Sequence, residues 1–165
     1  MPILARGRPP MTTFCFNSIG IVHSPFKEKF GVPRQPGIAP AAMATLELLP
    51  PYDRDETLDG LSGFSHVWLV FVFHASAEQA WSPTVRPPRL GGNARVGVFA
   101  SRSTFRPNPI GLSVVELAGY GREHGKLVLH LRGADLIDGT PVLDIKPYVP
   151  YVDSVPQAAG GFAAD

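Results

Sequence analysis

Hydrophobic residues in this chain occur in short runs, and the turn-forming residues Pro, Gly and Asp bound each run. Short apolar runs between turn residues are typical of β-strands. Leu127, Leu129 and Leu131 alternate with other residues, which places them on one face of a strand. Residues 67–73 are all apolar, which predicts a central strand covered on both sides. The predicted strands are 14–22, 45–48, 67–73, 96–100, 110–117, 127–131 and 142–145.

The composition does not favour long helices. The 165 residues include 18 prolines and 17 glycines; proline lacks a backbone donor, and glycine loses much conformational entropy in a helix. Only residues 75–81 predict a short helix. The length and the 44% of hydrophobic residues fit one compact domain. We therefore predict a flexible N-terminal extension at 1–12 and a mainly antiparallel β domain at 13–165, either a barrel or a sandwich with long ordered loops.

The charges are distributed unevenly along the chain. The formal net charge is only +1, yet no Asp or Glu occurs from Gln79 to Val115. Five arginines fall in that stretch without local neutralisation, which predicts an anion-binding face, with phosphate as the preferred anion. These arginines are Arg86, Arg89, Arg95, Arg102 and Arg106.

Four predicted loops combine prolines with polar residues, at 26–37, 85–93, 102–111 and 135–148. Proline lowers the entropy cost of ordering a loop, so such loops are suited to holding a ligand in one pose. Any one of them alone is equally well explained as strand-terminating Pro and Gly. The four together favour a ligand-binding site.

Several polar residues have both a structural and a functional interpretation. His66 and His74 are eight residues apart, so an unbroken strand would aim both at one face, with His74 better placed to touch a ligand. Asp138 either caps a turn or takes part in catalysis. Asp144 and Lys146 share a strand face, where an ion pair and catalysis are both open.

Cysteine content and hydropathy limit the cellular compartments that are expected for this protein. Cys15 is the single cysteine, which excludes an intramolecular disulfide and a cysteine-based zinc site, and we expect it to be a small buried strand residue. The sequence contains no compact set of three metal-ligating residues, so it does not predict a metal site. The longest apolar run, 67–73, is too short to span a bilayer, and no secretion signal is present. We therefore expect a soluble, cytoplasmic protein.

Six motifs in order closely resemble the TrmO family, also called TsaA-like or YaeB, over about 14–163. The motifs are Ile19–Lys27 (IGIVHSPFK), Pro33–Gly37 (PRQPG), Gly63–His66 (GFSH), Arg86–Gly92 (RPPRLGG), Arg102–Gly111 (RSTFRPNPIG) and Asp138–Pro141 (DGTP) with Asp144–Tyr148 (DIKPY).

The resemblance implies a single-sheeted antiparallel β barrel that forms homodimers. It also implies methylation, with S-adenosylmethionine, of N6 of N6-threonylcarbamoyladenosine at position 37 of a transfer RNA anticodon loop. Matched by motif, the cofactor contacts are Gln35, Pro36, Gly37, Phe73, His74, Arg102, Leu112, Asp138, Gly139, Thr140 and Pro141.

Methyl transfer needs an in-line acceptor and a dry site more than a covalent intermediate. The acceptor nitrogen is a poor nucleophile, so a base or a polarising cation would help. Exposed RNA bases can stack on aromatic rings. The predicted catalytic residues are Asp138, Asp144, Arg106 and Tyr148; the predicted RNA-binding residues are Arg34, Arg86, Arg89, Arg95, Phe105, Arg106 and Lys146.

One departure from the family pattern affects the expected RNA binding. Bacterial relatives usually continue into a small C-terminal domain that helps to grip RNA, and this chain stops shortly after Phe162, so we expect the accessory domain to be absent. Two other functions stay open. One is a non-enzymatic RNA-binding barrel; the other is a methyltransferase or hydrolase acting on a small anionic substrate.

Overall fold

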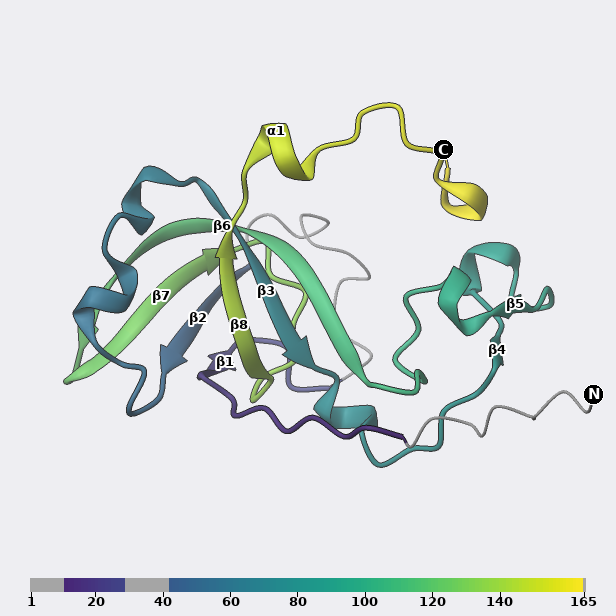
Figure 1. The fold of residues 1–165 in the computed structure, drawn as a ribbon, viewed down its shortest axis with the longest axis horizontal. Helices are drawn as coiled ribbons and strands as arrows, with labels where there is room; N and C mark the ends of the chain where they lie inside the picture. The colour runs from purple at the N-terminus through teal and green to yellow at the C-terminus, as the bar shows by residue number, and fades with distance from the viewer. Residues whose placement is uncertain (1–10, 29–41, 165) are drawn as a thin grey trace, which may run out of the picture.

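A computed structural model describes residues 11–28 and 42–164. In this part of the chain, six strands close into an antiparallel barrel in the order β1-β2-β7-β6-β3-β8, and β8 pairs with β1 to close the ring (Figure 1). This confirms the predicted single-sheeted antiparallel barrel. The barrel strands are β1 (Gly20–His23), β2 (Met43–Leu48), β3 (His66–Val72), β6 (Ile110–Glu123), β7 (Lys126–Arg132) and β8 (Pro141–Pro147).

Alternating residues of these strands fill the barrel. Leu127, Leu129 and Leu131 are buried on the inner face of β7, as their spacing predicted. Along β3, every second residue is fully buried and the residues between are half-buried, so the expectation of two covered faces holds only in part.

Some predicted elements differ from the observed ones. The first strand starts at Gly20, because 11–17 is exposed and unpaired within the described chain, and Cys15 is exposed, so its predicted burial is wrong. The predicted strand 96–100 is only β5 (Val96–Gly97), which pairs with β4 (Thr84–Val85) in a separate two-stranded sheet. The predicted helix at 75–81 is reduced to a 3-10 turn, His74–Ser76.

The β4–β5 hairpin lies beside the barrel, and the C-terminal segment reaches back to it (Figure 1). This segment contains the short helix α1 (Pro150–Asp153) and a 3-10 turn, Gly161–Ala163, which contacts the turn Pro88–Leu90. Of the helices in the described residues, none is long and apolar enough to cross a bilayer.

Because neighbouring strands are antiparallel, the connections alternate between the two ends of the barrel. The connections that follow β1, β3 and β7 leave from one end, which we call the loop end. The connections that follow β2 and β6 leave from the other, the far end. The polar, proline-containing segments at 85–93 and 102–111, and the first part of 135–148, therefore belong to connections of the loop end.

Candidate functional site

The loop end brings together predicted residues that are far apart in sequence. Phe73 and His74 follow β3 directly, and the amide of Phe73 donates a hydrogen bond of 2.8 Å to the carbonyl of Pro109, just before β6. His74 Nε2 lies 3.9 Å from where a Cβ on Gly139 would be, so the imidazole borders the turn that precedes β8. The C-terminal end of β3 and the N-terminal ends of β6 and β8 therefore lie at one site.

Gly111 is required where β3 and β6 meet. A Cβ at this position would lie 2.5 Å from the ring of Phe71 and 2.7 Å from that of Phe73, a separation that real structures do not tolerate. The two rings meet edge to face, with centroids 5.4 Å apart. The glycine therefore lets Phe73 pack against the barrel and fixes the start of the His74 turn.

Asp138 ties the loop before β8 to the end of β1. Its Oδ1 accepts a hydrogen bond from the Ser24 amide at 2.9 Å, and its Oδ2 forms an ion pair with Lys27 Nζ at 2.8 Å. Lys27, and then Ser24, lower the pKa of Asp138. Asp138 is therefore held ionised and is a weaker proton acceptor than a free carboxylate. It borders a pocket of about 430 Å³ beside β1 and β2.

Asp135 is a second carboxylate at the loop end, and it is absent from the residues that the motifs predicted. It lies between the buried residues Ala134 and Leu136, and Ser113 Oγ donates a 2.9 Å hydrogen bond to it from β6. Burial raises the pKa of Asp135, an effect that Ser113 and the nearby Arg102 partly offset. An acidic residue inside an apolar run was the signal available in the sequence.

The loop before β6 is braced by its own arginine. Arg106 Nη1 donates hydrogen bonds to the carbonyls of Ser101 at 2.8 Å and Ser103 at 3.3 Å. Thr104 Oγ1 donates to Ser76 Oγ at 3.2 Å, which links this loop to the turn after β3. Arg102, in contrast, is exposed. Arg106 therefore shapes the loop that presents Arg102.

Three of the predicted RNA-binding residues, Arg86, Arg95 and Phe105, meet in one cleft. The cleft measures about 860 Å³ and also includes Arg102 and, from the C-terminal turn, Phe162. Arg89 lies in the adjoining turn, Pro88–Leu90. This grouping joins the β4–β5 hairpin to the loop end of the barrel.

Other predicted residues do not join the loop end of this chain. Asp144 and Lys146 form an ion pair of 2.8 Å on β8, and Asp144 raises the pKa of Lys146. The residue after β8, Tyr148, contacts the rings of Trp68 and His66. A seven-residue strand spans roughly 20 Å, so Asp138 and Tyr148 cannot touch one acceptor atom within a single chain.

Two further predictions have specific outcomes. Leu112 lies on the outer face of β6 and is 50% exposed, so it can contact a ligand only from outside the barrel. His66 and His74 do not share a strand face, because the chain leaves β3 at Phe73 and turns. His66 instead pairs with Ser65, Nδ1 to Oγ, at 2.8 Å. Arg34, Gln35, Pro36 and Gly37 lie outside the described residues.

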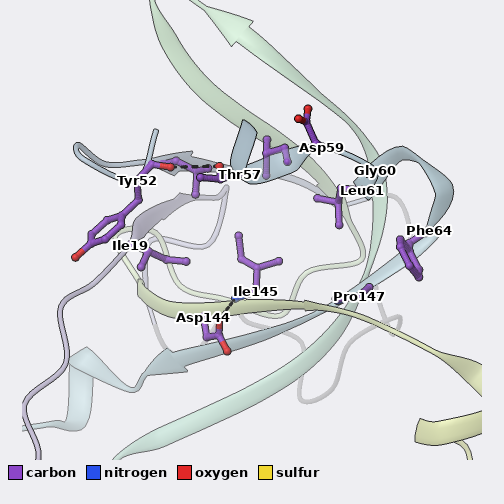
Figure 2. A pocket seen from close by; sticks show the side chains of 12 residues that line it. Ile19, Tyr52, Thr57, Asp59, Gly60, Leu61, Phe64, Asp144, Ile145 and Pro147 are labelled. Atoms are coloured by element: carbon purple, nitrogen blue, oxygen red, sulfur yellow. Dashed lines mark hydrogen bonds between the residues drawn. The ribbon is translucent and has the colours of Figure 1, made fainter. Parts of the chain in front are cut away.

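The far end carries a different cavity, of about 450 Å³ (Figure 2). Ile145 projects from β8 into the space below the 3-10 turns of 55–63, whereas the carboxylates of Asp144 and Asp59 point away from it. The interior of this cavity is thus apolar and lacks the charged groups that mark the loop end.

A metal site finds no support in the described residues. No group of three His, Cys, Asp or Glu side chains lies close enough together in that part of the chain to hold an ion. The described part of the loop end presents carboxylates, guanidinium groups, backbone groups and aromatic rings.

The fold and the loop end define a single-sheeted β-barrel protein with a candidate site at one end of the barrel. The family model of the tRNA-methyltransferase O N-terminal domain matches residues 21–154, and the chain belongs to this family. This confirms the family expected from the motifs.

Similar proteins agree with this assignment. The chain is 55% identical over 153 residues to the tRNA (adenine(37)-N6)-methyltransferase of Escherichia coli K12, covering 93% of this chain and 65% of that protein. It is 42% identical over 139 residues to a probable S-adenosyl-L-methionine-binding protein of Pyrococcus abyssi, covering 84% of this chain and 70% of that protein. The crystal structure of TrmO from Pseudomonas aeruginosa has a TM-score of 0.74 at 53% identity, covering 92% of this chain and 63% of that one.

Proposed function

We propose that this chain uses S-adenosylmethionine to methylate N6 of N6-threonylcarbamoyladenosine at position 37 of transfer RNA. Its similarity to the E. coli methyltransferase covers 93% of this chain but only 65% of that protein, so the activity of the whole relative is inferred for this chain. The observation that carries the proposal is the convergence at the loop end of the motifs after β3, before β6 and before β8.

The groups at the loop end fit an adenosyl cofactor. S-adenosylmethionine carries a sulfonium cation and a carboxylate, and the loop end offers Asp135 and Asp138 for the former and Arg102 for the latter. When bound, this cofactor supplies an electrophilic methyl group. His74, the turn at Gly139 and the predicted segment Gln35–Gly37 would hold it.

The residues of the chain then have two tasks: to position the acceptor and to take its proton. N6 of the modified adenosine gains a methyl group and must lose a proton, which a carboxylate can accept. Asp138 is the base that the motif suggested, but its ion pair with Lys27 lowers its basicity. The pKa of Asp135 is raised, so Asp135 is better suited to accept the proton. We propose Asp135 for this role, with Asp138 holding the loop.

We also propose that the chain forms a homodimer. Ile110 and Leu112 expose apolar side chains on the outer face of β6, and a second copy could cover them. Light scattering after gel filtration would test this, because a monomer at all concentrations contradicts it. A transfer RNA substrate would also place the protein in the cytoplasm, as expected from the sequence.

The direct test is incubation with S-adenosylmethionine and transfer RNA that carries or lacks threonylcarbamoyl at adenosine 37, followed by nucleoside mass spectrometry. A methyl gain only on the carrying RNA supports the proposal. Cofactor binding without methyl gain would favour a small anionic substrate. RNA binding without cofactor binding would favour the non-enzymatic barrel.

A further inference from the structure

The cleft beside the β4–β5 hairpin is larger than the two pockets at the barrel. It measures about 860 Å³, and its walls come from three segments: the hairpin, the loop before β6, and the C-terminal turn that contributes Phe162. Neither Asp135 nor Asp138 lines it. The cleft is therefore a separate compartment next to the proposed methyl-transfer site.

The cleft carries a positive charge. Arg86, Arg95 and Arg102 line it. In the described part of the chain no salt bridge or hydrogen bond engages the guanidinium groups of Arg86 and Arg95, whereas Arg102 interacts electrostatically with the neighbouring Asp135. The residues that line the cleft, which fall at 82–105 and at Phe162, include no acidic side chain. Such a site attracts a polyanion and repels a cation.

Aromatic surface accompanies these charges. Phe105 is 40% exposed, and Phe162 lines the same cleft from the C-terminal turn. Guanidinium groups next to exposed aromatic rings are the combination that binds single-stranded nucleic acid, by phosphate contacts and base stacking.

The same features argue against the cofactor as the occupant. S-adenosylmethionine carries a sulfonium and an ammonium cation beside one carboxylate, so its net charge is positive, and a cleft lined by three guanidinium groups and no carboxylate disfavours it. The loop end supplies the carboxylates that a sulfonium cation favours. Arg102 belongs to both places, since it lines the cleft and lies close enough to Asp135 to lower its pKa.

The cleft is also fixed by internal contacts. The amide of Ser82 donates a hydrogen bond to the carbonyl of Phe105 at 3.3 Å, and the amide of Val98 donates to the carbonyl of Pro83 at 3.0 Å. The two hydrogen bonds from Arg106 hold the loop that carries Arg102 and Phe105. Fixed walls reduce the entropy lost when a ligand binds.

We propose that this cleft binds an unpaired nucleotide next to the methylated adenosine, with its base against Phe105 and Phe162 and its phosphates on Arg86 and Arg95. This inference rests on the proposed function for the identity of the RNA. It gives the C-terminal segment 154–164 a role in RNA binding, through Phe162.

Charge reversal tests the phosphate contacts. Arg86→Glu and Arg95→Glu should each weaken binding of a fluorescently labelled anticodon stem-loop RNA about tenfold or more, because each loses a charge-assisted contact. Each should also reduce the slope of log affinity against log salt concentration by about one. The affinity for S-adenosylmethionine, measured by calorimetry, should stay unchanged. Arg54→Glu is the matched control, because Arg54 is exposed in the connection after β2 at the far end.

Phe162→Ala tests the stacking contact separately. It should weaken RNA binding roughly 5- to 100-fold without changing the salt slope, since stacking involves no counterion release. Tyr151→Ala is its control, because Tyr151 is 90% exposed and does not line the cleft. A photoreactive base beside adenosine 37 should crosslink to the peptide that contains Phe105 or Phe162.

The outcomes separate the cleft from the function. Normal RNA affinity in Arg86→Glu, Arg95→Glu and Phe162→Ala overturns the cleft proposal even if the wild-type chain methylates RNA. Weakened RNA binding in these variants of a chain that transfers no methyl group supports the cleft and contradicts the methyltransferase function. A wild-type chain that binds no RNA contradicts both.

Discussion

The two ends of the barrel share one core but differ in their connections. At the loop end, Asp138, Lys27, Asp135 and Arg102 lie around the strand ends, and prolines limit the freedom of the loops. At the far end, a cavity lined by apolar groups such as Ile145 lies below the turns of 55–63 (Figure 2).

This difference shows how the barrel separates stability from binding. The inner residues of all six strands maintain the fold at both ends, while the candidate site residues that the structure brings together lie in the connections of the loop end. Changes at the loop end should therefore affect activity, and equivalent changes at the far end should affect stability alone.

The largest effect is expected from Gly111→Val on β6. Its side chain would collide with Phe71 and Phe73, and overpacking of this kind costs about 1–3 kcal/mol, occasionally more. We expect a large fall in Tm together with loss of cofactor binding. Gly121→Val is the matched control on the same strand, because a Cβ there meets no atom within 4 Å. Equal destabilisation by both variants would contradict this account.

The second largest effect is expected from Asp135→Asn. Loss of a proton acceptor reduces the methylation rate by about 100-fold or more. The pKa of Asp135 is raised from its ordinary value of 3.8, so the wild-type free energy of unfolding should fall as the pH rises through the raised pKa, and the Asn variant should lose this fall. Urea unfolding at several pH values and single-turnover assays check both. An unchanged methylation rate would remove Asp135 from the mechanism.

Arg106→Ala should reduce methylation about tenfold, because it removes two charge-assisted hydrogen bonds that shape the loop before β6. RNA methylation should be affected more than cofactor binding. Steady-state kinetics with varied RNA, and calorimetry with the cofactor, measure the two effects. Equal loss of both would refute a role of Arg106 on the RNA side.

Ile145→Ala tests the far end. Removing a partly buried side chain should lower the free energy of unfolding by about 1–2 kcal/mol. The methylation rate and the RNA affinity of the folded protein should not change. Thermal unfolding and activity assays on the same sample check this, and a specific loss of activity would show that the far end takes part in function.

Lys27→Met should have the smallest effect on stability, well under about 1 kcal/mol, because the ion pair is exposed. Lys27 lowers the pKa of Asp138. The contribution of the ion pair to the free energy of unfolding is therefore present above the ordinary pKa of an aspartate, and it is lost as the pH falls through the lowered pKa of Asp138. Lys146→Met breaks a similarly exposed ion pair on β8. Only Lys27→Met should weaken cofactor binding in a calorimetric titration.

Local patterns in the sequence predicted much of the fold. The alternation of Leu127, Leu129 and Leu131 and the apolar run 67–73 identified strands and their buried faces, because strand periodicity is a local property. The uninterrupted stretch without acids from Gln79 to Val115 likewise identified the basic segment, because side-chain charge follows from residue type alone. The exposed start of the chain was missed, because Phe14 and Phe16 have strand propensity but no strand beside them in the described residues.

Only the tertiary structure decided which of these residues meet. Closure of the barrel places Asp138 at the loop end and Tyr148 beyond the opposite end of β8, although ten positions separate them in a motif-rich segment. It also places the half-buried Asp135 beside Ser113 and brings Phe162 to the arginine-lined cleft. The physical reason is that local residues decide whether a segment forms a strand, whereas the end of the barrel that a loop reaches depends on pairing between distant strands.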